Sequence, residues 1–187
     1  AACLQSLVEK GKTVVGAFAP PPIPNKKADP LSAAAEKLGI LILPLQIMRE
    51  QKAYEDFVSL SPELCIMAFV NDIIPGRIIN YPRLGTIHYH PSLLPKHRGR
   101  SSINWAVING ETKSGLSIIW PDEGIDTGPI LLQKEVEISP DDTTGSLYFN
   151  KLSPMGVKAI VEAVELIEKG IAPRIPQDDS QATYEPP

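Results

Sequence analysis

Short apolar runs alternate along the chain with longer segments whose apolar side chains recur at helical spacing. The runs cover residues 13–18, 40–43, 64–69, 85–90 and 116–120. Between them, residues 31–38, 50–60 and 102–109 place apolar side chains three and four positions apart, as a helix with one buried face does. The alternation indicates βαβ units. We therefore expect an α/β protein with a Rossmann-like, three-layer fold, in which a mostly parallel sheet carries helices on both faces.

Both ends of the chain depart from this alternation. Residues 130–138 end in a strict apolar–polar alternation, which predicts a late strand with one solvated face that joins the sheet antiparallel. The Asp-Asp-Thr-Thr run at 141–144 offers N-capping side chains for a long helix that ends near Gly170. Residues 1–10 predict a helix, so we expect the chain to begin inside an αβ unit, without the strand that normally precedes such a helix.

Length and composition favour one domain with a trailing segment. We expect this domain over residues 1–172 of the 187, with a proline-containing tail or linker over residues 173–187. The formal net charge of −4 argues against a broad surface for nucleic acid, and no stretch approaches the ~20 apolar residues of a membrane span. The two cysteines form no CxxC pair and indicate a reducing compartment. A cytoplasmic location is expected, and mitochondrial import stays open.

Two histidines and a later carboxylate carry the candidate chemistry. His88 and His90 lie two positions apart at the end of a predicted strand that Pro91 terminates, so both imidazoles face the same side. In open α/β sheets, ligands bind beyond the carboxyl ends of the strands. Asp126 lies in a turn bracketed by glycines, and its negative charge would favour the protonated form of His90. An imidazole and a carboxylate brought together in this way can transfer protons near neutral pH.

Other interpretations compete at the same residues. Asp122 and Glu123 are also available as the carboxylate, and the sequence does not separate the three acids. The two histidines with His97 and a nearby Asp could ligate zinc or iron, but the cations that flank His97 oppose this, so no metal is expected. The basic cluster at 96–100 would either grip an anionic group or form a solvated loop. Ser92 is a poor nucleophile candidate, because no GxSxG elbow is present.

At these residues the chain resembles the formyltransferase-type folate enzymes. The hallmark of that group is an Asn-x-His-x-Ser-Leu-Leu-Pro segment followed by an Asp loop. Here residues 88–95 are His-Tyr-His-Pro-Ser-Leu-Leu-Pro, and residues 124–128 are Gly-Ile-Asp-Thr-Gly. Within the group, the chain is most similar to the N-terminal hydrolase domain of the 10-formyltetrahydrofolate dehydrogenases, through residues 97–99, 103–105, 126–135 and 172–185. The resemblance implies the three-layer formyltransferase fold.

The resemblance also implies roles for single residues, with 10-formyltetrahydrofolate as the formyl donor. His90 would act as general acid and base beside the formyl carbon, and Asp126 would set its protonation and help to position water or an amine. His88 occupies the position where the transferases carry the Asn that hydrogen-bonds the formyl oxygen. The hydrolase domain of the dehydrogenases departs from Asn there as well, with an apolar residue. The folate would be bound by two loops, formed by Asn71, Asp72 and Ile73 and by Asp122, Glu123 and Gly124.

The expected reaction removes the formyl group from 10-formyltetrahydrofolate. Water would be the acceptor, giving tetrahydrofolate and formate, or the group would pass onward to carrier and dehydrogenase domains of a longer protein. One alternative is transfer to an amine: an amino sugar, glycinamide ribonucleotide or methionyl-tRNA. The acidic chain disfavours the RNA substrate. The other alternative is a folate-binding domain without catalysis.

Overall fold

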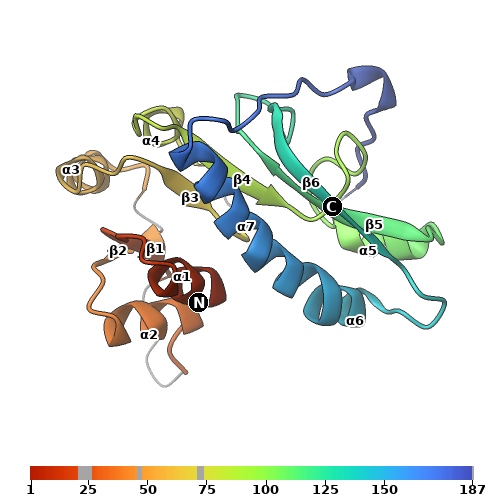
Figure 1. The fold of residues 1–187 in the computed structure, drawn as a ribbon, viewed down its shortest axis with the longest axis horizontal. Coiled ribbons are helices and arrows are strands. Elements are labelled where there is room, and N and C mark those ends of the chain that lie inside the picture. The colour runs from red at the N-terminus through yellow and green to blue at the C-terminus, as the bar shows by residue number, and fades with distance from the viewer. Residues whose placement is uncertain (21–26, 46–47, 71–73, 187) are drawn as a thin grey trace. The chain divides into compact units, whose positions relative to one another are not determined.

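The computed structural model describes residues 1–20, 27–45, 48–70 and 74–186, which fall into two compact units (Figure 1). The first unit comprises residues 1–65 and 72–85, and the second comprises residues 66–71 and 86–187. The histidines and the carboxylate that the sequence singles out all belong to the second unit. The candidate site can therefore be described within one unit.

The first unit has the predicted alternation of helices and strands. Its elements are α1 (Ala2–Glu9), β1 (Ala17–Ala19), α2 (Pro30–Lys37), β2 (Ile42–Pro44), α3 (Gln51–Ser59) and α4 (Gly76–Ile79). β1 pairs with β2 in parallel, as a βαβ unit requires. Leu4 of α1 and the alanines Ala34 and Ala35 of α2 form a buried cluster against which residues of both strands pack. α2 begins where the carboxylate of Asp29 accepts hydrogen bonds from the first amides of the helix.

The second unit is built on a sheet with the strand order β3-β4-β5-β6. Its strands are β3 (Cys65–Met67), whose first residue belongs to the first unit, β4 (Thr86–His90), β5 (Lys113–Ile119) and β6 (Ile130–Glu137). Its helical elements are α5 (Ser102–Ile108), α6 (Thr144–Ser146), a π-helical segment (Leu147–Leu152), α7 (Ser153–Glu168) and a 3₁₀ turn (Asp179–Gln181). α7 packs against β5 and β6 (Figure 1).

The strand β5 runs antiparallel to both of its neighbours. Its antiparallel pairing with β6 is the one that the alternating pattern of β6 predicts. Its pairing with β4 is antiparallel too, although the sequence places residues 116–120 in the parallel part of the sheet. This local expectation is wrong because a continuous apolar run indicates burial on both faces and not strand direction. Residues 114–119 are all buried. The fold class is α/β as predicted, with a mixed sheet.

The long helix predicted to end near Gly170 is observed over residues 144–168, as α6, the π-helical segment and α7. At its start, the hydroxyl of Thr143 accepts a hydrogen bond from the Ser146 amide at 3.1 Å, and the Ser146 hydroxyl accepts one from the Thr143 amide at 3.0 Å. Further along, Gly156 lies against the ring of Tyr89 on β4, where an added Cβ would come within 2.7 Å of Cε2. Tyr89 thus points toward α7, and the residues on either side of it point to the opposite face of the sheet.

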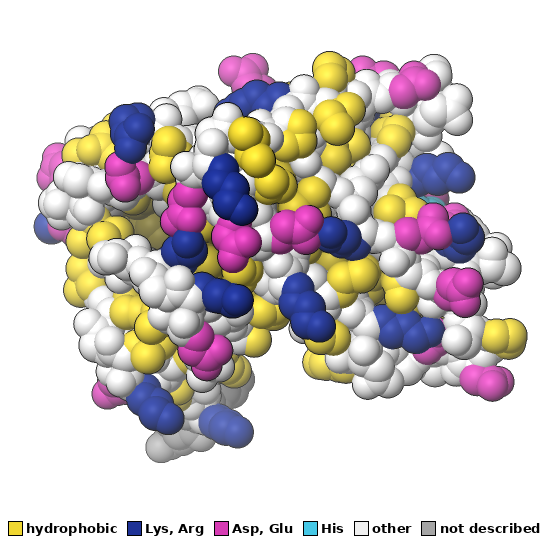
Figure 2. All heavy atoms as spheres, viewed as in Figure 1, with side chains coloured by type: hydrophobic (Ala, Val, Ile, Leu, Met, Phe, Trp, Pro, Cys, Tyr) yellow, Lys and Arg dark blue, Asp and Glu magenta, His cyan; other side chains and the backbone are white. Residues whose placement is uncertain are grey.

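Acidic and basic side chains are intermixed on the surface. Figure 2 shows Lys and Arg side chains interspersed with Asp and Glu side chains over the face drawn. This distribution agrees with the small formal net charge of −4. Among the described residues, no helix is long and apolar enough to cross a membrane.

Candidate active site

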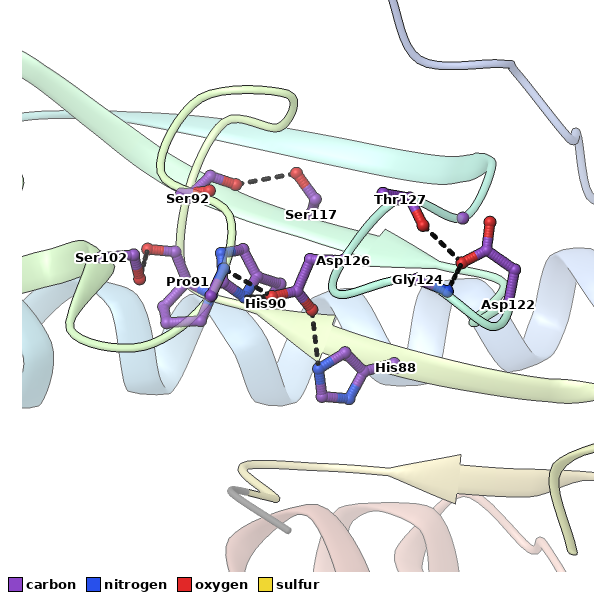
Figure 3. Close-up of polar contacts among 12 residues, drawn as sticks. His88, His90, Pro91, Ser92, Ser102, Ser117, Asp122, Gly124, Asp126 and Thr127 are labelled. Carbon is purple, nitrogen blue, oxygen red and sulfur yellow. Dashed lines mark hydrogen bonds and ion pairs between the residues drawn. The ribbon is translucent and has the colours of Figure 1, made fainter. Parts of the chain in front are cut away.

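The carboxyl end of β4 presents two histidines on one face. His88 and His90 both point toward the loop that follows β5, whereas Tyr89 between them points toward α7 (Figure 3). His90 is the last residue of β4 and only 4% exposed, and Pro91 follows directly after the strand. The structure thus brings the two imidazoles to one place, as the period of two along a strand predicts.

Asp126 lies between the two imidazoles. Its Oδ1 is 3.5 Å from Nε2 of His88, and its Oδ2 is 3.4 Å from Nδ1 of His90 (Figure 3). All three side chains are mostly buried, with exposed fractions of 11%, 5% and 12% for His88, His90 and Asp126. Oδ2 also accepts a hydrogen bond from the amide of Gly99 at 2.8 Å. The carboxylate is therefore directed at both rings at once, in a place where water screens its charge poorly.

Asp126 is the one of the three candidate carboxylates that faces the histidines. Asp122 uses its Oδ1 within its own turn, where it accepts hydrogen bonds from the Gly124 amide at 3.0 Å and the Thr127 hydroxyl at 2.6 Å (Figure 3). Glu123 is exposed. Asp126 itself has a φ of +55°, a left-handed conformation that Asp tolerates better than most residues. This conformation turns its side chain back toward β4.

A backbone carbonyl determines which nitrogen of His90 carries a proton. Nε2 of His90 lies 2.8 Å from the carbonyl oxygen of His97. A carbonyl can only accept, so Nε2 carries hydrogen, and the lone pair of the neutral ring lies on Nδ1. Nδ1 is the nitrogen that faces Asp126. Protons can therefore be gained and lost at Nδ1, next to a carboxylate.

Burial has opposite effects on the two members of this pair. It is the largest influence on His90 and lowers the pKa of the imidazole, outweighing the Asp126 carboxylate, which raises it. Burial would raise the pKa of Asp126. However, the adjacent His88 imidazole, the positive charge of protonated His90 and the Gly99 amide together hold that pKa below its ordinary value. At neutral pH the site combines a proton-accepting imidazole with an ionised carboxylate.

His97, which the sequence offered as a third metal ligand, is turned away from the other histidines. Its Nε2 lies 2.8 Å from Oε1 of Glu111, and its Nδ1 lies 3.3 Å from Oε1 of Glu185. The two nitrogens of an imidazole point in opposite directions, so these acids cannot share one ion with the ring. The contribution of His97 to the site is its backbone carbonyl.

The basic cluster at 96–100 contains one buried cation, Arg98, whose guanidinium is bound by side chains of the protein. Arg98 is 3% exposed, and its guanidinium donates to Oδ1 of Asp179 at 2.6 Å and to Oε1 of Gln177 at 2.8 Å. Lys96 and Arg100 are exposed. Arg98 therefore ties the site loop to the C-terminal segment and is not available to grip an anionic group. Only the two exposed cations could do that.

Gln177 supports the carboxylate loop, although no motif in the sequence singles it out. Its Nε2 donates hydrogen bonds to the carbonyl oxygens of Asp126 and Gly128, both at 2.8 Å. Its Oε1 accepts from Arg98. One amide thus holds the left-handed turn in place from a segment 51 positions away. The only signal in the sequence was the resemblance of residues 172–185 to the hydrolase domain, which says nothing about a single side chain.

Gln177→Ala is expected to lower the melting temperature and the pKa of His90 together. Loss of the two hydrogen bonds to the loop costs about 2 kcal/mol, or roughly 4–8 °C in a domain of this size. Once the loop is released, the Asp126 carboxylate lies farther from His90. The pKa of the imidazole then falls further, because the carboxylate is what raises it. Thermal melting and an NMR titration of the imidazole protons measure both changes.

Gln181→Ala is the matched control for this prediction. Gln181 is exposed and lies in the same C-terminal segment, and among the described residues its side-chain amide donates only to the Ser180 hydroxyl, at 3.4 Å. The Gln181→Ala variant should have the melting temperature and the His90 pKa of the unmodified protein. Equal behaviour of the two variants would mean that Gln177 does not hold the loop.

The remaining expected binding residues are only partly located. Asn71, Asp72 and Ile73 lie outside the described residues. Asp122, Glu123 and Gly124 are exposed in the loop that carries Asp126. This loop borders the cluster of imidazoles and carboxylate (Figure 3).

Comparison with known proteins identifies the family. A family model described as formyl transferase matches residues 24–164. The chain belongs to the formyl transferase family. It is 48% identical over 186 residues to human cytosolic 10-formyltetrahydrofolate dehydrogenase, and 47% identical over 186 residues to the human mitochondrial protein of that name. Each match covers 96% of this chain and 20% of the relative, so the chain spans about one fifth of the length of these relatives.

Solved structures share the fold of this family member. Glycinamide ribonucleotide transformylase 1 from Symbiobacterium toebii matches with a TM-score of 0.78 over 94% of this chain and 88% of its own, at 20% identity. HypX from Aquifex aeolicus in complex with tetrahydrofolic acid matches with a TM-score of 0.66 over 83% of this chain and 27% of its own, also at 20% identity. The predicted α/β formyltransferase fold is confirmed. At these identities the likeness concerns the fold alone.

Proposed function

We propose that this chain binds 10-formyltetrahydrofolate and removes its formyl group. The observation that carries the proposal is the position of Asp126 between His88 and His90, within 3.5 Å and 3.4 Å of their ring nitrogens. A buried imidazole that is neutral at neutral pH, next to an ionised carboxylate, is suited to general acid–base catalysis. Membership of the formyl transferase family and the names of the dehydrogenase relatives supply the substrate.

In the proposed reaction, a water molecule attacks the formyl carbon, and Nδ1 of His90 accepts a proton from this water. The new carbon–oxygen bond gives a tetrahedral intermediate. The bond between that carbon and the folate nitrogen then breaks, and His90 returns its proton to the nitrogen. The products are tetrahydrofolate and formic acid, which loses a proton to solvent. Asp126 stabilises the imidazolium that exists between these two steps, because its carboxylate lies beside Nδ1.

His88 is assigned the stabilisation of the negative charge that develops on the formyl oxygen. Its Nε2 faces the cluster, 3.5 Å from Asp126. A ring that carries hydrogen on Nε2 can donate to an oxyanion. The Asn that the resemblance places here in the transferases donates at any pH. An imidazole does so only in one tautomer or when it is charged. We propose that this difference favours water over an amine as the acceptor.

The folate is expected to lie along the loop that carries Asp126. Backbone groups of a loop recognise the edges of a pterin at little entropic cost. In this loop the Gly124 amide is already bound by the Asp122 carboxylate, so recognition falls to other backbone groups of Asp122, Glu123 and Gly124. Asn71, Asp72 and Ile73 remain proposed partners of the folate.

The fate of the formyl group depends on the length of the native protein. The relatives are dehydrogenases about five times as long as this chain, which spans 20% of them. In a protein of that length the group would pass to a carrier domain and then to a dehydrogenase domain. Their names place relatives in both the cytosol and the mitochondrion. We propose a cytoplasmic location for this protein.

The test is incubation of the purified chain with 10-formyltetrahydrofolate, alone and with each candidate amine. Formate and tetrahydrofolate are expected in equal amounts without any amine. Turnover that requires an amino sugar or glycinamide ribonucleotide would replace hydrolysis by transfer. Tight folate binding without turnover in any mixture would leave a non-catalytic folate-binding domain.

A further inference from the structure

The contacts within the His88–His90–Asp126 cluster are longer than ordinary direct hydrogen bonds. The contacts of 3.5 Å and 3.4 Å exceed the 2.7–3.2 Å usual for a hydrogen bond from nitrogen to oxygen. Zinc bonds of about 2.0–2.2 Å place neighbouring donors of a tetrahedral site roughly 3.3–3.6 Å apart. Both measured distances fall in that interval, although each ends on a different oxygen of Asp126: Oδ1 faces His88 and Oδ2 faces His90. One donor atom from each of the three side chains lies within 4.8 Å of the other two.

We propose that His88, His90 and Asp126 bind a divalent transition-metal ion of the zinc type. Two neutral imidazoles and one carboxylate are a donor set that such ions prefer. From the sequence, no metal is expected, because the candidate ligands include His97 and the cations that flank His97 oppose metal binding. In the structure the third side chain of the group is Asp126, and Arg98, the buried cation of the 96–100 segment, is paired with Asp179.

Two of the three ligands already have the partners that orient a metal ligand. Metal-bound histidines usually donate their other ring N–H to a carbonyl or a carboxylate, and His90 donates Nε2–H to the His97 carbonyl at 2.8 Å. That bond leaves Nδ1, the nitrogen facing Asp126, as the donor to the ion. The Asp126 carboxylate is held by the Gly99 amide at 2.8 Å.

His88 completes the site and also limits its strength. Without His88 only one imidazole and one carboxylate would remain, which is too few donors for a stable site. If Nε2 of His88 binds the ion, hydrogen must lie on Nδ1, and this buried atom has no hydrogen-bond partner among the described residues. Loss of such an orienting partner typically weakens metal binding about 10–100-fold. The ion is therefore expected to exchange and to be removed by chelators.

Occupancy by the ion and proton transfer exclude each other. The ion would take the lone pair of Nδ1 of His90, which is the proton acceptor of the proposed reaction. Zinc is thus expected to inhibit formate release reversibly. This consequence rests on the proposed function, whereas the binding itself does not.

The experiment is a titration of chelator-treated full chain with Zn²⁺ against a chromogenic chelator. One Zn²⁺ per chain is expected, not displaced by excess Mg²⁺, which prefers oxygen ligands. His88→Asn and Asp126→Asn should each weaken binding at least about 10-fold. Glu135→Gln removes an exposed carboxylate outside the cluster, where it pairs with Lys113, and should bind Zn²⁺ as the unmodified protein does. Co²⁺ absorption in the visible range, intense for a tetrahedral site, reports on ligation directly, and thermal melting shows which variants are folded.

The outcomes separate the two proposals of this chain. The metal site would be overturned if the unmodified protein bound no stoichiometric Zn²⁺ or Co²⁺, or if His88→Asn left the binding intact. If the unmodified chain releases formate but binds no Zn²⁺, only the metal site is overturned. If it binds Zn²⁺ but never releases formate, only the proposed hydrolysis is overturned.

Discussion

Replacing His90 with alanine is expected to lower kcat/KM for formate release by about 10²- to 10⁴-fold, the contribution of a positioned general base. The expectation follows from geometry. The His97 carbonyl binds Nε2–H, so Nδ1 beside Asp126 is the nitrogen that can accept a proton from water. Steady-state formate production by the purified variant measures the loss. His90→Gln is the companion variant, because its amide can still donate to the His97 carbonyl. The same loss is expected there, with the loop held in place.

The pH dependence of kcat/KM distinguishes the role of His90 from that of Asp126. His90 must be neutral to accept a proton, so activity falls as the pH drops through the pKa of its imidazole. Because burial lowers that pKa, the acidic limb is expected below the ordinary value of about 6.5. Asp126→Asn removes the charge that raises the pKa of His90. The limb should then move to still lower pH, while the rate on the plateau falls by about 10²-fold or more.

A charge-matched control guards this result against general electrostatic effects. Glu135→Gln removes one negative charge from an exposed ion pair with Lys113, which joins β6 to β5 in the same sheet. It should keep both the rate and the acidic limb of the unmodified protein. Turnover that survives in folded His90→Ala and His90→Gln, or a limb that Asp126→Asn moves to higher pH, would contradict the assignment.

The elements of the fold followed from apolar spacing, whereas strand direction did not. Helices predicted at 31–38 and 50–60 occur as α2 and α3, within one or two residues at each end. A strand with one solvent-exposed face shows alternating apolar and polar residues. This pattern predicts that β6 pairs antiparallel, as it does. β5 is buried on both faces and therefore has the sequence of a parallel strand. Its direction is decided by where the chain re-enters the sheet, which local spacing does not encode.

Local geometry predicts the shared face of the two histidines, whereas Asp126 was selected by the family resemblance and not by the residue pattern alone. A strand repeats every two residues, so His88 and His90 had to share a face once that strand was recognised. The choice of Asp126 over Asp122 and Glu123 depends on a left-handed φ of +55°, and neighbouring turn residues give no rule for that angle. Gln177 belongs to a segment far along the chain, and its role exists only after folding.

The same limit explains why the backbone part of the site escaped the sequence. The His97 carbonyl and the Gly99 amide determine the protonation of His90 and the direction of Asp126. Backbone carbonyls and amides do not depend on the side chain, so the residue types in the sequence do not show which of these groups takes part in the site. Gly99 has a φ of +88°, which L side chains rarely adopt. The glycine is visible in the sequence, but the hydrogen bond that its conformation permits is not.

Replacing Gly128 with alanine is expected to destabilise the protein by about 3 kcal/mol, at the upper end for overpacking, and to lower its melting temperature by roughly 6–12 °C. An added Cβ would lie 1.8 Å from the carbonyl oxygen and 2.8 Å from the carbonyl carbon of Trp120. These are backbone atoms of the chain leaving β5, so no side-chain rotation relieves the clash. The loop that carries Asp126 has to move. Differential scanning calorimetry measures the change in stability.

Activity should fall further than stability alone predicts. Gln177 holds the carbonyls of both Gly128 and Asp126, so displacing one end of the turn displaces the carboxylate at the other. A shift of about 1 Å in a catalytic group can cost about 10²-fold in rate, and a loss of that order is expected in the folded fraction. Gly145→Ala is the control, because an added Cβ there meets nothing closer than the Thr143 hydroxyl at 3.7 Å. In the helix α6 alanine is favoured over glycine by up to about 1 kcal/mol, so this variant should be as stable as the unmodified protein or more so. If the two glycine variants melted and turned over alike, the close approach of Gly128 to Trp120 would not be what positions Asp126.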